Sequence, residues 1–339
     1  NDIYEYDLTD YYTTGSYDVN FAGESALTSA IDYVTSEDLP KVYTLTGHGE
    51  GELSSNFENA VEKENIDLAE LSLLTEEGVP EDADCVLIYA PQTDISQDEL
   101  EMLREYLQAG GALFLITDPI VDGTTRPNLD ALMEGYGVTA ADGMVLEGSM
   151  SNSYRYPYYL LPTINSHTIT SPLRDGGYYV LLSVAQGLTV SDDLPDGVSV
   201  TQLLTTSDSA FSKPLDGWTL TTFDKEEGDV DGPFALAVAV TDEIDDDTQS
   251  HIVWVSSSSL LDDAANEMVS GSNQDLFLNA LSWMCGQEEG ITIHAKSITA
   301  DYLTVDSATA SAMTAIIIGV IPLCFLGAGI FIWVRRKRQ

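Results

Sequence analysis

Basic residues are scarce in this chain of 339 residues. It contains 13 Lys and Arg against 56 Asp and Glu, which gives a formal net charge of −43 at pH 7. A surface with this charge repels nucleic acid and anionic lipid, so nucleic acid is excluded as a partner. Two interpretations of the acidity stay open, namely solubility outside the cell or in a salty setting, and capture of cationic ligands or divalent ions.

Cysteine and histidine are also rare. The 3 cysteines form no Cys-x-x-Cys pair and are too few for a disulfide framework. The 4 histidines are scattered, and no His-Glu-x-x-His motif occurs. An acidic stretch at 227–232 is similar to the start of a calcium loop, but Val238 stands where the bidentate Glu is needed. The sequence therefore predicts no metal site and no cofactor.

The common catalytic motifs are missing as well. There is no Gly-x-Ser-x-Gly nucleophile elbow and no phosphate-binding Gly-x-x-x-x-Gly-Lys-Ser/Thr loop. Asp118-Pro119, and no cysteine, follows the predicted strand at 112–117, so no nucleophilic cysteine stands on a strand-to-helix turn there. We therefore predict a protein that is not an enzyme and has no catalytic residues. A hydrolase that uses Asp118 or His48 is kept as a minor alternative.

Residues 41–63 predict a strand, a glycine-rich turn and a helix. β-formers fill 42–45, three glycines follow in the turn, and Ser54 or Ser55 is placed to cap the helix. This is the opening unit of a parallel α/β sheet. Ligands of such sheets usually bind at the carboxyl ends of the strands.

The candidate ligand-binding residues therefore follow predicted strands. They are Thr46, Gly47, His48, Gly49, Glu50, Asp118, Ser256 and Ser257. Two interpretations of the turn remain open. Its amides bind an anion at the helix N-terminus, or its glycines only shape the turn while His48 and Glu50 hydrogen-bond to neighbouring loops. We favour the second.

Strands and helices alternate along most of the chain, which favours parallel βαβ units. The clearest helix covers 96–109, where Ser96 and Glu99 form a capping box. Shorter helices are predicted at 129–136 and 274–285. Further strands are predicted at 66–73, 86–89, 112–117, 234–240 and 251–256.

Residues 145–233 interrupt this alternation and are interpreted as a β-rich insertion. β segments are predicted at 179–182, 198–205 and 218–223. Tyrosines cluster at 154–159, either as a sugar-stacking or partner surface or as packing under the insertion.

Residues 312–334 carry no charge and predict one transmembrane helix. Trp333 suits the membrane interface, and the Arg-Arg-Lys-Arg run that follows indicates a cytoplasmic C-terminus with the acidic body outside. Because the chain begins with Asn1, we expect that a preceding segment was removed.

These observations divide the chain into seven parts. The predicted parts are an acidic segment 1–40, α/β residues 41–144, the insertion 145–233, α/β residues 234–289, a connector 290–311, the membrane helix 312–334 and a basic tail 335–339.

Four motifs together resemble the GldG-like family of auxiliary proteins of gliding-motility-type ABC transporters. They lie at 42–50, 100–119, 203–207 and 279–283. The resemblance implies a flavodoxin-like fold similar to class I glutamine amidotransferases, without their catalytic machinery. It also implies an additional N-terminal membrane helix, and partnership with a membrane permease and, through it, a cytoplasmic ATPase. The chain departs from the family at 256–259, where four serines replace a frequent Gly-Asp-Ser.

The resulting hypothesis is a non-enzymatic, membrane-anchored extracytoplasmic subunit that binds a ligand or partner above the permease. The alternative is a membrane-tethered surface protein that binds carbohydrate or peptide on its own.

Overall fold

The structure is a computed structural model. It describes residues 39–120, 125–215, 220, 222–245 and 247–286, with the short strands Tyr4–Asp7, Asp18–Phe21 and Lys296–Ser297 and single positions near both ends. The three short strands, β1, β2 and β18, form an antiparallel sheet of their own.

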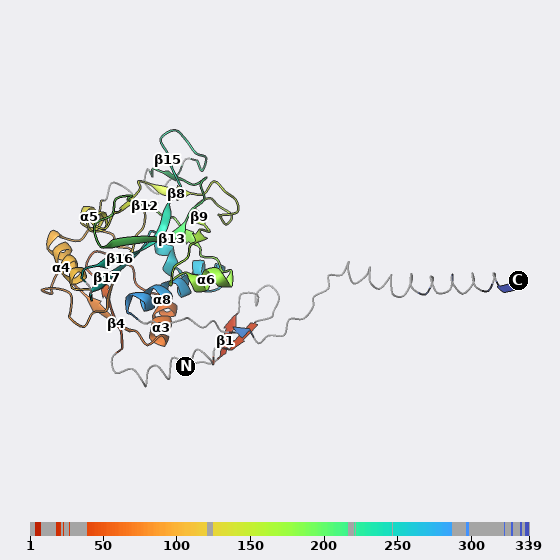
Figure 1. The fold of residues 1–339 in the computed structure, drawn as a ribbon, viewed down its shortest axis with the longest axis horizontal. Helices are drawn as coiled ribbons and strands as arrows, with labels where there is room; N and C mark the ends of the chain where they lie inside the picture. The colour runs from red at the N-terminus through yellow and green to blue at the C-terminus, as the bar shows by residue number, and fades with distance from the viewer. Residues whose placement is uncertain are drawn as a thin grey trace.

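A ten-stranded sheet forms the centre of the body, with the order β10-β13-β16-β17-β6-β5-β3-β4 and with β12 and β7 off this path (Figure 1). Its strands are β3 (Lys41–Leu45), β4 (Asp67–Leu71), β5 (Cys85–Tyr89), β6 (Ala112–Ile116), β7 (Val138–Ala140), β10 (Thr163–Ile164), β12 (Leu188–Val190), β13 (Val198–Thr205), β16 (Ala235–Glu243) and β17 (Gln249–Val255).

The sheet is mixed, which corrects the predicted parallel sheet. β17, β6, β5, β3 and β4 run parallel to one another. In contrast, β16 is antiparallel to β17 and to β13, and β10 is antiparallel to β13. The cause lies in the connection, because the link from β16 to β17 is too short for a crossover and permits only a hairpin.

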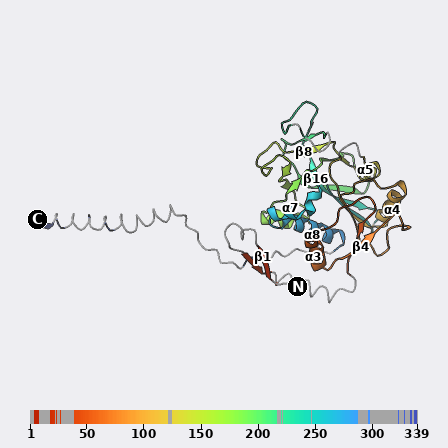
Figure 2. The ribbon, with the colours of Figure 1, turned by 180° about the vertical axis from the view of Figure 1, so that it is seen from behind.

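Helices cover both faces of the sheet (Figures 1 and 2). Their bounds are α3 (Ser55–Lys63), α4 (Gln97–Gln108), α5 (Pro127–Glu134), α6 (Ser171–Gly176), α7 (Asp263–Met268) and α8 (Ser272–Met284), with a 3-10 turn η1 (Ser258–Leu261). Helices α3 and α8 pack on one face, and α4 and α5 pack on the other.

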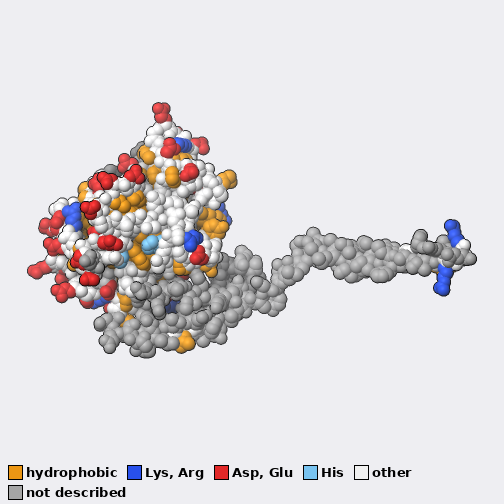
Figure 3. All heavy atoms as spheres, viewed as in Figure 1, with side chains coloured by type: hydrophobic (Ala, Val, Ile, Leu, Met, Phe, Trp, Pro, Cys, Tyr) orange, Lys and Arg blue, Asp and Glu red, His pale blue; other side chains and the backbone are white. Residues whose placement is uncertain are grey.

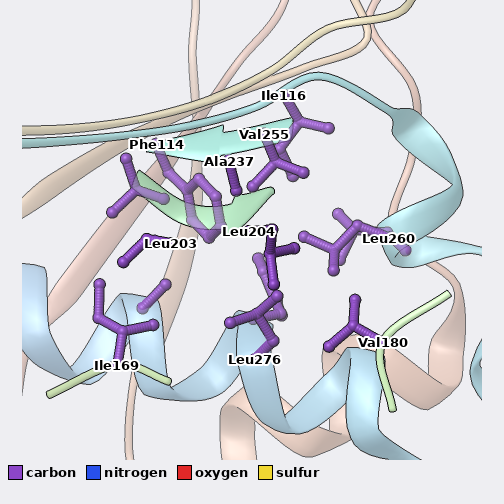
Figure 4. Packing of buried hydrophobic residues seen from close by; sticks show 14 of the residues in the cluster. Phe114, Ile116, Ile169, Val180, Leu203, Leu204, Ala237, Val255, Leu260 and Leu276 are labelled. Atoms are coloured by element: carbon purple, nitrogen blue, oxygen red, sulfur yellow. The ribbon is translucent and has the colours of Figure 1, made fainter. Parts of the chain in front are cut away.

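Alternation along the strands divides the buried side chains between two clusters. On β6, Phe114 and Ile116 face α8, whereas Leu113 and Leu115 face α4. Figure 4 shows Phe114 and Ile116 above Leu276 of α8, with side chains from neighbouring strands between them. The core is therefore a three-layer α/β/α arrangement.

Helix α4 begins as predicted. The amide of Glu99 donates to Ser96 Oγ at 3.3 Å, and the amide of Ser96 donates to Glu99 Oε2 at 2.8 Å, so the capping box is complete. The start of α3 differs from the prediction. Ser54 occupies the N-cap position but its side chain accepts no bond from the start of the helix; its hydroxyl donates to Asp263 Oδ1 at 2.8 Å.

Residues 145–233 contain many short strands and also extend the central sheet. Strand β13 has the predicted bounds and pairs along β16. The remaining short strands are β8 (Met144–Leu146), β14 (Phe211–Lys213) and β15 (Val230–Asp231) in one small sheet, and β9 (Tyr159–Leu160) and β11 (Leu182–Ser183) in another. The strand predicted at 179–182 is observed only at Leu182–Ser183. Half of the segment predicted at 218–223 lies outside the described residues, and its described residues, 220, 222 and 223, are not in a strand.

Almost all of the predicted membrane segment 312–334 also lies outside the described residues. Within the described part of the chain, no helix is both long enough and apolar enough to cross a membrane. Carboxylates are spread over the visible face of the body (Figure 3).

Candidate functional site

A cavity of about 650 Å³ lies beside the carboxyl ends of β5, β6 and β17. This is the edge of the sheet where α/β proteins usually bind ligands. The cavity is lined by Glu52, Ser54, Tyr89, Asp118, Tyr159, Ser183, Val184, Ser258, Ser259, Leu261, Asp262, Asp263, Ala264, Ala265 and Met268. We call it the acidic cavity.

Hydrogen bonds to its loops hold three of its carboxylates in place. Asp118 Oδ1 accepts the amide of Ser258 at 2.7 Å, which joins the end of β6 to η1. Asp262 Oδ1 caps α7 by accepting the amide of Ala265 at 2.8 Å. Asp263 accepts the hydroxyl of Ser54. The fourth carboxylate, Glu52, is exposed at the rim. Four carboxylates around one cavity produce a potential that attracts cations.

Tyr89 forms part of the wall and depends on a nearby glycine. A Cβ at Gly51 would lie only 2.6 Å from the Tyr89 ring, so only glycine lets the ring pack there. The Tyr89 hydroxyl donates to the Ser258 carbonyl at 3.4 Å. Burial, reinforced by Asp118 and Asp262, raises the pKa of Tyr89 to about 12. Tyr89 is therefore a neutral hydrogen-bond donor at physiological pH.

The glycine-rich turn has its own internal partners. The amide of His48 donates to Glu50 Oε2 at 2.7 Å, and the carbonyl of His48 accepts the amides of Gln92 and Thr93. Gly47 has φ +124° and Gly49 has φ +76°, values that favour glycine. These bonds support the interpretation in which the glycines shape the turn. Anion capture is disfavoured because a carboxylate already accepts from an amide of this turn.

His48 also connects the turn to α4. Its Nδ1 lies 3.0 Å from Glu50 Oε1 and its Nε2 lies 3.1 Å from Glu99 Oε2, and all three side chains are buried. Burial by itself raises the pKa of Glu99, but hydrogen bonds from Ser96 and the neighbouring His48 outweigh it, so that the pKa is lowered. The remaining oxygen, Glu99 Oε1, is buried without a hydrogen bond.

Among the eight predicted site residues, the acidic cavity takes in Asp118. Thr46 donates its hydroxyl to the Leu71 carbonyl at 3.2 Å. Ser256 and Ser257 are fully buried, and their hydroxyls donate to the carbonyls of Leu236 and Ser183. The structure therefore does not bring these eight residues together in one site.

Several lining residues were not predicted. Tyr89 is the last residue of β5, so the same carboxyl-end argument that selected Asp118 would also have selected it. Asp262 carries an N-cap signal, an aspartate directly before a short helix. Ser258 and Ser259 stand in a run of four serines, where the type of side chain alone gives no basis for choosing among them.

The lining of the acidic cavity offers carboxylates and hydroxyls for hydrogen bonding. It contains carboxylates and hydroxyls but no Cys, His, Lys or Arg among the described residues. Cys85 is the first residue of β5, and burial raises the pKa of its thiol. Such a thiol is a poor nucleophile. In the described part of the chain, no group of His, Cys, Asp and Glu side chains is arranged to hold a metal ion.

Comparison with known proteins gives a family and a fold. The family described as an ABC-type uncharacterized transport system matches residues 39–280. No curated protein matches the chain. The N-terminal domain of mmIFT52 is similar in structure, with a TM-score of 0.53 and 14% identity, covering 75% of this chain and 99% of that domain.

Two further solved structures are less similar. A putative ThuA-like protein from Bacteroides uniformis has a TM-score of 0.44 at 12% identity, covering 74% of this chain and 93% of that one. A putative GMP synthase component from Thermoplasma acidophilum has a TM-score of 0.35 at 11% identity, with 74% and 96% covered. The predicted α/β fold is confirmed by the strand order and by the similarity to the mmIFT52 domain, with a sheet that is mixed rather than wholly parallel.

Proposed function

Because the chain belongs to the family of auxiliary components of ABC-type transport systems that residues 39–280 match, we propose that it is a non-enzymatic, membrane-anchored extracytoplasmic subunit. It binds a ligand or partner above a permease and acts, through the permease, with a cytoplasmic ATPase. The family supports the association with transport, and the finer role is our proposal.

The acidic cavity is the observation that carries the proposal of a binding role. It lies at the ligand-binding edge of the sheet, and its lining offers donors and acceptors without a pair of nucleophile and base. The residues proposed for ligand contact are therefore Asp118 with Glu52, Tyr89, Ser258 and Asp263.

The proposed anchor is the uncharged segment 312–334. The basic residues after Trp333 favour a cytoplasmic C-terminus, which leaves the acidic body outside. Small residues in the segment, Gly319 and Gly327 among them, permit close approach to another helix. A helix docked on the permease would transmit ATP-driven movement through the connector 290–311.

The test is purification of the full-length chain from native membranes in mild detergent. We expect a permease and an ATPase to co-purify in a constant ratio. The matched control replaces 312–334 by a polyleucine span of the same length, which keeps the anchor but removes the small residues, and we expect it to lose the permease. Recovery of the wild-type chain alone would contradict the proposal.

The alternative is a tethered protein that binds carbohydrate or peptide by itself, and exposed tyrosines next to the acidic cavity favour it. Tyr179 is 65% exposed and Tyr154 is 39% exposed. The same purification separates the two functions, because the alternative predicts a ligand-binding chain without a permease.

A further inference from the structure

A second hollow adjoins the acidic cavity and differs from it in chemistry. It has a volume of about 320 Å³ and is lined by Tyr154, Leu161, Gly177, Tyr178, Tyr179, Leu181, Met268, Val269 and Ser270. We call it the tyrosine groove. Single exposed apolar side chains are ordinary on a protein surface, but three tyrosines and an exposed methionine around one hollow indicate a binding surface.

The groove and the acidic cavity are connected. Met268 lines both, and it is 55% exposed. The amide of Tyr154 in the groove donates to the carbonyl of Tyr159 in the cavity at 2.8 Å. A ligand longer than one ring can therefore contact both at once.

Two glycines at the end of α6 position the backbone and the Tyr178 ring at the groove. Gly177 ends α6 in a left-handed conformation with φ +70°, which directs the chain into Tyr178 and Tyr179. A Cβ at Gly176 would overlap the Tyr178 ring, so glycine is required beneath it. A preorganised aromatic wall lowers the entropic cost of binding.

The charged side chains around the two hollows determine whether an anionic or a cationic ligand is attracted. The acidic cavity presents Glu52, Asp118, Asp262 and Asp263, and no basic side chain lines either hollow within the described residues. Arg155, next to the groove in sequence, already has its guanidinium over the Tyr154 ring at 5.0 Å. An anionic ligand would be repelled, and a cation would be attracted.

The remaining lining groups favour a ligand rich in hydroxyls. Four serine hydroxyls, from Ser54, Ser183, Ser258 and Ser259, surround the carboxylates. Hydroxyls and carboxylates together accept from and donate to the hydroxyl and amino groups of a sugar. Tyrosine rings offer an apolar face and a polar tip, which suits the C–H face and the hydroxyl edge of a pyranose.

We infer that the tyrosine groove and the acidic cavity together bind an oligosaccharide with protonated amino groups, of the glucosamine type. A sugar ring lies against Tyr179, and an ammonium group enters the cavity near Glu52 and Asp118. This inference rests on the proposed non-enzymatic binding function and names its ligand class.

The test is calorimetric titration of the full chain in a detergent without a sugar headgroup. The probes are a glucosamine trimer, the N-acetylglucosamine trimer as a neutral sugar with the same rings, and spermine as a cation without rings. We expect the glucosamine trimer to bind at least about ten-fold more tightly than either control. Equal binding of the acetylated trimer would overturn the ammonium assignment, equal binding of spermine would overturn sugar recognition, and binding of none would overturn both.

Substitutions in the tyrosine groove and in the acidic cavity test where the glucosamine trimer binds. We expect Tyr179→Ala and Glu52→Gln each to weaken glucosamine trimer binding by about five- to ten-fold, and the salt dependence to fall in Glu52→Gln. The matched surface controls are Leu74→Ser and Glu58→Gln, both at exposed positions that do not line either hollow, and they should bind like the wild type. Equal loss in the controls would overturn the location.

The proposed transport role and the proposed sugar ligand can each be contradicted without contradicting the other. Co-purification of a permease with a chain that binds no glucosamine trimer would overturn this inference alone. Trimer binding by a chain that purifies without a permease would overturn the transport role alone.

Discussion

The imidazole of His48 lies 3.1 Å from Glu99 Oε2, and this contact ties the turn after β3 to the first turn of α4. The opposite ring nitrogen lies 3.0 Å from Glu50 Oε1. The His48 side chain therefore contacts two buried carboxylates, one from the turn after β3 and one from helix α4. This explains how a glycine-rich turn holds one shape.

Removing the imidazole should destabilise the fold. We expect His48→Ala to lower the free energy of unfolding by about 2–4 kcal/mol, because Glu50 and Glu99 both lose a buried partner. Urea unfolding of the full chain measures this change. Glu58→Gln on the exposed face of α3 is the control and should change the free energy by less than about 0.5 kcal/mol. If His48→Ala also lowered the free energy of unfolding by less than about 0.5 kcal/mol, this would contradict the stabilising role of the imidazole.

Glu99 should contribute to acid sensitivity. Its pKa is lowered in the folded protein, so its ionised form stabilises the fold above the unfolded value of about 4.3, and this contribution is lost as the pH falls through the lower folded value. Glu99→Gln keeps the capping box while it removes the charge. We therefore expect the wild type to lose more stability than the variant between about pH 5 and about pH 3, in urea unfolding at each pH. If the free energies of unfolding of the wild type and the variant fell equally with pH, this would contradict the contribution of Glu99 to acid sensitivity.

Ser54 and Ser96 both occupy the N-cap position of a helix but make different hydrogen bonds. Ser96 caps α4 with its hydroxyl, whereas the hydroxyl of Ser54 bonds to Asp263 rather than to the start of α3. We expect Ser96→Ala to cost about 1 kcal/mol of unfolding free energy and Ser54→Ala to cost less than half of that. Equal costs would show that the N-cap of α4 contributes nothing beyond a surface hydrogen bond.

Local patterns predicted much of the sheet. Strands β3, β5 and β6 were predicted because each is a short run of apolar β-formers, and helix α4 was predicted because its apolar residues recur at helical spacing. Strand β13 was predicted with the observed bounds, yet its place in the central sheet depends on antiparallel pairing with β16, which lies far along the chain. Long-range pairing of this kind leaves no local signal.

The residues of the acidic cavity could likewise be predicted only in part from the sequence. Asp118 could be predicted because it directly follows a strand, and Ser256 and Ser257 were proposed for the same reason. Strand β17 ends at Val255, and the two serines that follow it are buried, whereas the 3-10 turn presents Ser258 and Ser259 to the cavity. Which serine faces the ligand site is decided by backbone geometry and not by residue type.

The coupling of Tyr89 to the carboxylates offers a direct probe of the acidic cavity. Burial and the charges of Asp118 and Asp262 raise the pKa of Tyr89 to about 12. In Asp118→Asn the side-chain oxygen still accepts the amide of Ser258, so the loop is kept while the charge is lost. We expect the pKa of Tyr89 to fall, and the measurement is a pH titration of its ¹³Cζ resonance, assigned by comparison with Tyr89→Phe.

Asp67→Asn, at an exposed position in β4 that does not line the cavity, is the control and should leave the resonance of Tyr89 unchanged. An unchanged pKa in Asp118→Asn would mean that burial alone sets the ionisation of Tyr89. A fall would show that the charge of Asp118 acts inside the cavity, where it would also act on a bound cation. Because this titration needs neither ligand nor permease, it tests the electrostatics of the cavity independently of both proposals.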